Sequence, residues 1–166
     1  MKKIDAIVSK VTALIGGVTF VGMILIIVMN VFARFIFMKS FAWAEEIAYL
    51  LLNWSVFMGV CHLYKINALV AIDVLVNALP HAAKRVVNLI VFVMMFVLNI
   101  GLVIWSWTLA MATFTGRVTP ILKIPYFWYY IAVTIAAVVL AAYSIGFIVK
   151  VLKNEEIEEA ALQDRA

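Results

Sequence analysis

Residues able to form ion pairs or hydrogen bonds lie on both sides of one short polar connection: Asn30 and Arg34 before it, and Trp43, Glu45 and Glu46 after it. An arginine that faces a pair of carboxylates can form a charge-assisted and often bidentate ion pair. Such a pair would hold two helix ends together or offer a charged patch to a partner. Acidic residues also favour the first turn of any helix, and Arg and Trp are common anchors at a membrane boundary. The spacing alone therefore leaves a purely structural explanation open.

Four long stretches without charge define the elements that must position this cluster. No Asp, Glu, Lys or Arg occurs in residues 11–33, 47–64, 86–116 and 124–149. A hydrocarbon core about 30 Å thick needs about 20 apolar residues to be crossed by a helix. The sequence, which is 67% hydrophobic, therefore predicts an all-α membrane protein with four transmembrane helices in one domain, residues 1–166. We place the spans at about 11–37, 41–64, 81–116 and 124–150, followed by an acidic tail at 151–166.

The predicted spans hold almost no ionisable group at mid-membrane depth. Proton relays, ion pathways and sites for charged substrates usually need such groups. The chain is therefore expected to be the partner of a transporter rather than a transporter itself. An intramembrane enzyme is disfavoured as well, because the spans contain no His/Glu metal set and no Ser/His/Asp trio. We expect no enzymatic activity and no cofactor.

The two histidines, His62 and His81, are predicted to lie near the same membrane surface. A haem held by membrane helices needs imidazoles at matching depth on facing helices, so a single bis-histidine site is conceivable. His81 neighbours Lys84 and Arg85, however, and is expected to be solvated, which disfavours haem. The one cysteine, Cys61, cannot form a disulfide within the chain, and no set of metal ligands occurs.

An apolar segment at residues 66–79 is too short to span the membrane and is interrupted by polar residues, among them Asp73. Segments of this length are typical of interfacial or re-entrant structure. We predict a short interfacial helix between the second and third spans, or a bent continuation of the second span. The Asp73 carboxylate should either meet a nearby Lys or Arg or lie on a solvated face.

Small residues in the first two spans indicate faces suited to close helix packing. Ala13 and Gly17 are four residues apart in the first span, a spacing that lets helices approach closely. In the second span Ala48, Ser55 and Gly59 fall on one helical face, which we expect to be a close-packing seam.

The distribution of Lys and Arg predicts the orientation of the chain. Nine of the 13 Lys and Arg residues precede the first span, lie between spans two and three, or follow span four. The other four, Arg34, Lys39, Arg117 and Lys123, lie in the two remaining connections. The positive-inside rule then places both termini in the cytoplasm. Nucleic-acid binding is not expected, because no basic cluster stands clear of the membrane ends.

At the level of motifs, the sequence resembles the small membrane subunit of tripartite ATP-independent periplasmic (TRAP) transporters. The resemblance rests on Asn30 and Arg34 followed by the Trp-Ala-Glu-Glu run that ends at Glu46, and it continues through Gly59, Asp73 and the Leu79-Pro80 step. It covers the whole chain in length, span number and topology. Family members often carry a Gly-His pair shortly before the Asp, whereas this chain has Ile-Asn-Ala-Leu at residues 66–69.

The resemblance implies a division of labour among three proteins. A large membrane subunit would carry an organic acid, such as a C4-dicarboxylate or a sialic acid, by an elevator-like motion coupled to a sodium gradient. A periplasmic binding protein would deliver the substrate. The small subunit would be a non-catalytic scaffold for the large one and would help to dock the binding protein, with membrane lipids around it. Asn30, Arg34, Trp43, Glu45, Glu46 and Asp73 are then expected to be its structural or partner-binding residues.

One alternative function remains at this stage, a self-contained dimeric transporter of the four-helix small multidrug type. That class has a similar number of spans. It carries a membrane-embedded carboxylate in its first helix, however, and the first span here has none. Its chains are also shorter, with tighter loops.

Overall fold

The computed structural model describes residues 2–65, 81–114 and 116–152, and within these ranges the chain is helical apart from two connections. The helices are α1 (Lys2–Phe37), α2 (Ala42–Lys65), α4 (His81–Phe114) and α5 (Phe127–Leu152). All four are long and apolar enough to cross a membrane. The shortest, α2, has 24 residues, which at 1.5 Å per residue gives about 36 Å, more than the hydrocarbon core requires. The predicted all-α fold with four spanning helices is confirmed.

The helix ends differ from the predicted ones in two places. The first helix begins at Lys2 rather than near residue 11, and α1 runs without interruption to Phe37. The last helix begins at Phe127 rather than near residue 124, because residues 117–126 fold back on themselves. The predicted interfacial helix at 66–79, with Asp73, and the acidic tail from residue 153 lie outside the described residues.

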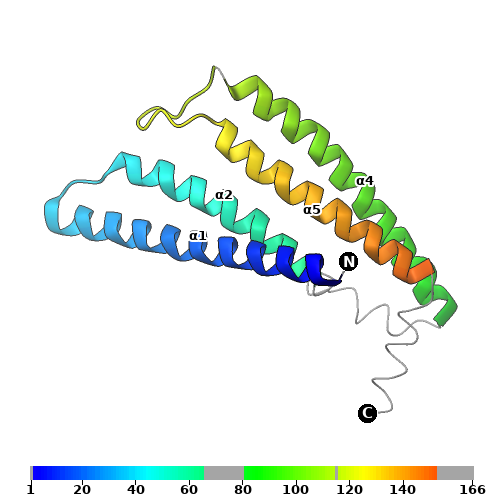
Figure 1. Ribbon diagram of the computed structural model, residues 1–166. Helices are drawn as coiled ribbons and strands as arrows, with labels where there is room; N and C mark the ends of the chain where they lie inside the picture. The colour runs from blue at the N-terminus through cyan, green and yellow to red at the C-terminus, as the bar shows by residue number, and fades with distance from the viewer. Residues whose placement is uncertain (1, 66–80, 115, 153–166) are drawn as a thin grey trace, which may run out of the picture.

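Two antiparallel helix pairs make up the molecule (Figure 1). Residues 38–41 connect α1 to α2, and the loop at residues 116–126 approaches the start of α2 as it connects α4 to α5. The two pairs meet where α2 packs against α5, so that the helices follow each other in space as α1, α2, α5 and α4. Both connections lie at one end of the molecule, which we call the loop end, and the described start of α1 lies at the other.

The seam between α2 and α5 holds the buried core. Cys61 and Tyr64 of α2 pack against Ala136 and Leu140 of α5, and all four are almost inaccessible. Tyr64 Oη lies 2.8 Å from Ser144 Oγ, and Ser144 in turn donates to the carbonyl of Leu140 at 2.9 Å. Because serine has only one hydroxyl proton, Tyr64 is the donor in this contact. The seam therefore combines apolar packing with a buried hydrogen bond between the hydroxyls of Tyr64 and Ser144.

A second seam joins α4 to α5 through residues spaced seven apart on α4. These are the buried residues Phe92, Asn99, Ser106 and Thr113. Phe92 stacks on Phe147 of α5 with 5.1 Å between ring centroids, and Ser106 Oγ lies 2.9 Å from Thr134 Oγ1. A strict seven-residue repeat keeps one narrow stripe of a helix against its neighbour. Apart from this stripe and the buried Ala110, most large apolar side chains of α4 are exposed.

The close contact between α1 and α2 involves Gly16, which lies outside the predicted small-residue pair. A Cβ atom at Gly16 would lie 3.1 Å from the backbone nitrogen of Gly59 and 3.4 Å from the carbonyl oxygen of Ser55. A Cβ atom at Gly17 would have no neighbour within 4 Å. Gly17, of the predicted small-residue pair, points away from α2, so a close approach of another helix at that position stays a prediction. The predicted face of α2 is confirmed, because Ala48 and Ser55 are buried and Gly59 meets Gly16.

Candidate functional site

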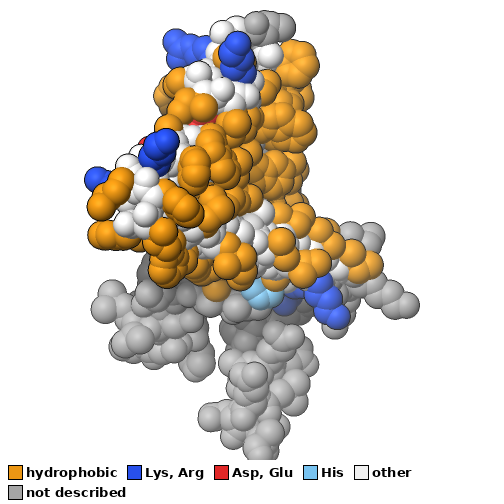
Figure 2. Space-filling view, turned by 90° about the vertical axis from the view of Figure 1, so that its left-hand side faces the viewer, with side chains coloured by type: hydrophobic (Ala, Val, Ile, Leu, Met, Phe, Trp, Pro, Cys, Tyr) orange, Lys and Arg blue, Asp and Glu red, His pale blue; other side chains and the backbone are white. Residues whose placement is uncertain are grey.

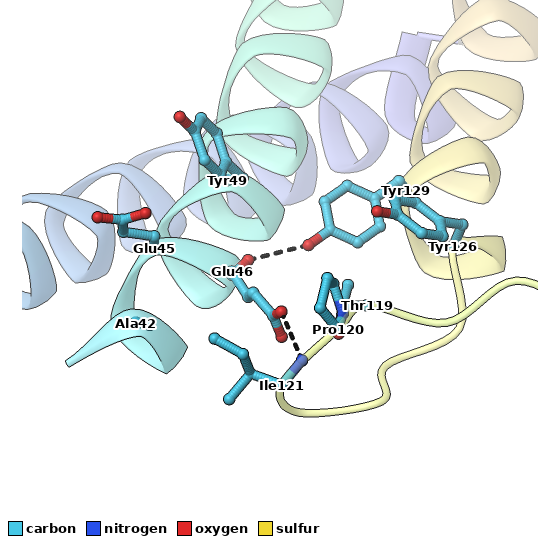
Figure 3. Close-up of a pocket in the computed structure, with 9 residues that line it drawn as sticks. All are labelled: Ala42, Glu45, Glu46, Tyr49, Thr119, Pro120, Ile121, Tyr126 and Tyr129. Atoms are coloured by element: carbon cyan, nitrogen blue, oxygen red, sulfur yellow. Dashed lines mark hydrogen bonds between the residues drawn. The ribbon is translucent and has the colours of Figure 1, made fainter.

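The Glu46 carboxylate, near the start of α2, is held by the loop between α4 and α5. Its Oε1 accepts a hydrogen bond from the backbone N–H of Ile121, and its Oε2 accepts one from that of Leu122, both at 2.9 Å. Figure 3 shows the carboxylate directed at this turn. Two successive N–H groups form a small anion-binding concavity, and hydrogen bonds to a charged acceptor are stronger than neutral ones. Glu46 therefore ties the α1–α2 pair to the α4–α5 pair.

The loop also has hydrogen bonds of its own, in addition to those with Glu46. A single antiparallel bridge pairs Val118 with Pro125. Thr119 donates its backbone N–H to the carbonyl of Ile124 at 2.9 Å, and its Oγ1 accepts the N–H of Ile124 at 3.0 Å. The turn between them includes Lys123 at a φ of 54°, a conformation that non-glycine residues rarely adopt. These contacts leave the N–H groups at the tip of the turn free to bind a carboxylate.

Tyr129 adds a second connection at the same place. Its hydroxyl donates to the backbone carbonyl of Glu46 at 2.9 Å (Figure 3). About two helical turns further along α2, Asn53 Nδ2 donates to the carbonyl of Tyr129 at 2.7 Å, and Trp54 Nε1 donates to that of Trp128 at 3.1 Å. Polar side chains in an apolar surrounding are stabilised by such interhelical bonds. Three side-chain hydrogen bonds thus hold the start of α5 against α2.

The connection between α1 and α2 is closed by Asn30. Its Oδ1 accepts the backbone N–H of Phe41 at 2.8 Å, eleven residues further along the chain. Met38, in the same connection, has a φ of 53°. The rings of Phe41 and Trp43 lie 5.8 Å apart and tilted, so Trp43 packs on the connection it follows. Asn30 and Trp43 are therefore structural residues of this turn.

Arg34 does not make the expected ion pair. Its side chain is exposed, and within the described ranges it forms no salt bridge with Glu45 or Glu46. Glu46 faces the loop, whereas Glu45 points away from it (Figure 3). Arg34 and Glu45 nevertheless line one pocket between α1 and α2. The predicted cluster thus divides into a structural part, with Asn30, Trp43 and Glu46, and an unpaired part, with Arg34 and Glu45.

Two pockets open at the loop end on either side of α2. One, of about 500 Å³, lies between the start of α2 and the loop and is lined by residues that include Glu45, Glu46, Tyr49 and Tyr126 (Figure 3). The other, of about 360 Å³, lies between α1 and α2. Both are shallow and partly apolar. They suit contact with a partner or a lipid better than the enclosure of a reacting substrate.

Positive charge surrounds these pockets. The exposed cations at this end are Arg34 and Lys39 on one connection and Arg117 and Lys123 on the other. Figure 2, which views the molecule from the loop end, shows Lys and Arg side chains at the top and at the middle left with little acidic surface between them, and further Lys or Arg side chains lower down on the right. Against the four cations of the two connections stand the two carboxylates at the start of α2, Glu45 and Glu46. The loop end therefore presents a net positive surface.

The remaining candidate residues do not join this site. At the opposite end His62 Nδ1 lies 2.9 Å from Ser9 Oγ, which fixes α1 to α2. Asp73 and the side chain of His81 lie outside the described residues. In the part of the chain that the structure describes, no three His, Cys, Asp or Glu side chains gather in a way that could hold a metal ion.

The sequence did not predict the partners of Glu46. Backbone N–H donors have no residue type of their own, so Ile121 and Leu122 carry no signal that marks them as ligands of a carboxylate. The signal that was present is the proline at position 120, which favours a turn in the middle of the connection. Tyr129 was not among the predicted site residues either, although its hydroxyl donates to the carbonyl of Glu46.

Comparison with known proteins gives one clear match. Residues 23–154 match the family model described as "Tripartite ATP-independent periplasmic transporters, DctQ component". This region includes the loop end, both pockets and the α2–α5 seam. No curated protein matches the chain.

Proposed function

The chain belongs to the family of DctQ components of tripartite ATP-independent periplasmic transporters, and from this membership we propose that it is the non-catalytic small subunit of a sodium-coupled transporter for organic acids. Its task is to brace a large, elevator-type membrane subunit. The substrate is an organic acid of the sialic acid or C4-dicarboxylate class. Substrate and sodium bind to the large subunit, and the periplasmic binding protein selects the substrate.

The observation that carries the bracing role is the absence of charge along the middle of every described helix. From residue 11 to 33, 47 to 64, 86 to 114 and 127 to 149 there is no Asp, Glu, Lys or Arg. Coupled transport of an anion usually places ionisable groups at that depth. The large apolar side chains of α1 and α4 are instead exposed, with Leu14 at 68% and Trp105 at 75%. These outer helices offer surfaces for lipid and for the large subunit.

A rigid connection at the loop end fits a brace. Glu46 and Tyr129 join the two helix pairs there, and Tyr64 and Ser144 join them toward the other end. A scaffold has to resist the motion of the subunit it supports. Contacts at both ends of the α2–α5 seam provide that resistance better than a contact at one end.

The distribution of Lys and Arg supports a periplasmic location for the loop end. The excess of Lys and Arg near the termini and between the second and third spans favours a cytoplasmic location for both termini. The loop end then faces the compartment of the binding protein. The four exposed cations and the prefolded loop at residues 117–126 make this end suited to an acidic patch on that protein.

Reconstitution into proteoliposomes tests the division of labour. We expect uptake of the organic acid only when this chain, the large subunit and the binding protein are all present with an inward sodium gradient. Uptake by this chain alone would support the self-contained transporter and contradict the proposal. Full uptake without this chain would show that no brace is needed.

Docking is tested separately by charge reversal at the loop end. Lys123→Glu combined with Arg117→Glu should raise the concentration of binding protein needed for half-maximal uptake several-fold, and added salt should weaken the wild type more than the variant. Lys10→Glu, at the opposite end, is the control. An unchanged dependence on binding protein would exclude the loop at 117–126 from docking.

A further inference from the structure

The groove between α1 and α2 has the features of a lipid site. Its deep part is apolar, with Met23 and Ile27 from α1 and Leu52 from α2. Its rim at the loop end carries Arg34 from α1 and Glu45 from α2. The apolar part of the groove suits an acyl chain of a phospholipid, and the charged rim suits its head group.

The length of the groove matches one leaflet of a bilayer. Met23 precedes Arg34 by eleven residues on α1, which at 1.5 Å per residue is about 16 Å. Half of a hydrocarbon core about 30 Å thick is about 15 Å. A guanidinium at the head-group level therefore has an apolar lining below it that reaches about the middle of the membrane.

The two helices themselves close the deep end. A Cβ atom at Gly22 would lie 3.5 Å from Cδ1 of Leu51, and at Gly16 the backbones come closer still. The groove thus begins where α1 and α2 separate and widens toward the connection between them. The lining of the groove therefore ends near Gly22, where the two helices come together.

The charges on the rim are not used by the protein. Neither Arg34 nor Glu45 makes a side-chain hydrogen bond or ion pair with any residue that the structure describes. A guanidinium binds phosphate oxygens in a bidentate manner. A carboxylate facing the same groove would repel a purely anionic head group, whereas it can accept hydrogen bonds from a primary ammonium.

We propose that the α1–α2 groove binds one phospholipid whose head group carries a phosphate and a primary amine, as in phosphatidylethanolamine. Arg34 binds the phosphate, Glu45 binds the ammonium, and one acyl chain lies along Met23 and Ile27. A transmembrane helix of the large subunit is the competing occupant.

Lipid analysis of the purified chain tests the proposal. The tagged full-length chain is isolated in mild detergent with whatever membrane proteins accompany it, and the phospholipid retained per chain is measured by mass spectrometry. Arg34→Gln should lower the retained phosphatidylethanolamine about tenfold, because a bidentate charge-assisted contact is lost. Lys39→Gln removes the same charge from the neighbouring connection, outside the groove, and should retain the wild-type amount. Equal retention by both variants would overturn the proposal.

Head-group selectivity is tested on delipidated protein. Phosphatidylethanolamine should raise the melting temperature of the wild type more than phosphatidylcholine does, because the trimethylated amine of phosphatidylcholine cannot donate hydrogen bonds to Glu45. Glu45→Gln should abolish this preference while leaving a response to both lipids. Equal responses of the wild type to the two lipids would refute the role of Glu45.

Cross-linking distinguishes lipid from protein in the groove. A photo-reactive residue in place of Ile27, which lines the groove, should label phospholipid and no protein. A cross-link from position 27 to the large subunit would identify a protein occupant and overturn the proposal. This outcome would leave the bracing function intact, so the two proposals fail separately.

Discussion

The Glu46 carboxylate accepts a hydrogen bond of 2.9 Å from the backbone N–H of Leu122, although the two residues are 76 positions apart in the sequence. This contact joins the first helix pair to the loop of the second. It explains an acidic residue at this position better than the general preference of helix starts for carboxylates, because Glu45 next to it satisfies that preference and makes no such bond.

Removing the charge of Glu46 should release the loop at residues 117–126. In Glu46→Gln the side-chain oxygen can still accept a hydrogen bond from one of the two backbone N–H groups. The side-chain NH2 group then faces the other N–H, and two donors cannot bond to each other. We expect trypsin to cleave after Lys123 several-fold faster than in the wild type, because local opening of the loop becomes more frequent. Glu45→Gln makes the same charge change without touching the loop and should leave the rate unchanged. Equal cleavage rates in the wild type and in Glu46→Gln would contradict the conclusion that the Glu46 carboxylate holds the loop.

Asn30 should be needed as an acceptor and not as an amide. Asn30→Asp keeps an oxygen within reach of the N–H of Phe41 and should be tolerated, whereas Asn30→Leu leaves that N–H without its partner. We expect Asn30→Leu to lower the free energy of unfolding by about 1 kcal/mol, a fall in melting temperature of about 2–4 °C. The measurement is thermal unfolding of the purified protein in detergent. A loss as large in Asn30→Asp would show that the amide nitrogen matters more.

Adjacent glycines of α1 should respond differently to alanine. At Gly16 the added methyl would lie 3.1 Å from the backbone of Gly59, so α1 and α2 must move apart, and overpacking of this kind costs about 1–3 kcal/mol. At Gly17 the methyl meets nothing within 4 Å, and the gain in helix propensity makes Gly17→Ala neutral or stabilising. Parallel melting curves test the pair. If Gly17→Ala were the more harmful change, the packing of α1 on α2 would have to be revised.

Tyr64 and Ser144 should be energetically coupled across the α2–α5 seam. Tyr64→Phe removes one buried hydrogen bond of 2.8 Å and should cost about 1 kcal/mol. Once Tyr64 is replaced, Ser144→Ala should cost less than it does in the wild type, because the bond between the two hydroxyls is already gone. A double-mutant cycle measures the coupling, and about 0.5–1.5 kcal/mol is expected. Strict additivity would place the two hydroxyls out of contact.

Length and charge were enough to predict the helices. The stretches without charge are each long enough to span, and the structure places a helix in every one of them. The sequence could not show whether Gly16 or Gly17 faces α2, because the four-residue spacing of Ala13 and Gly17 is the same whichever way the helix is rotated. The rotation of α1 is set by its contact with Gly59 of α2, which a pattern within α1 cannot encode.

The site was predicted in part for a similar reason. Asn30, Arg34, Glu45 and Glu46 do gather at one end, as their positions beside one short connection require. The pairing among them was not predictable, because Glu46 bonds to backbone donors of a loop far away in sequence and leaves Arg34 without a carboxylate within the described ranges. Interactions between two side chains can be inferred from residue types, but interactions with backbone groups depend on how a loop is folded.

Purification of the tagged chain from native membranes in mild detergent, with mass spectrometry of the proteins that accompany it, tests the central claim most directly. The account predicts recovery of one much larger polytopic membrane protein in equal amount with this chain. Recovery of the chain alone as a dimer would contradict it and would favour a self-contained transporter.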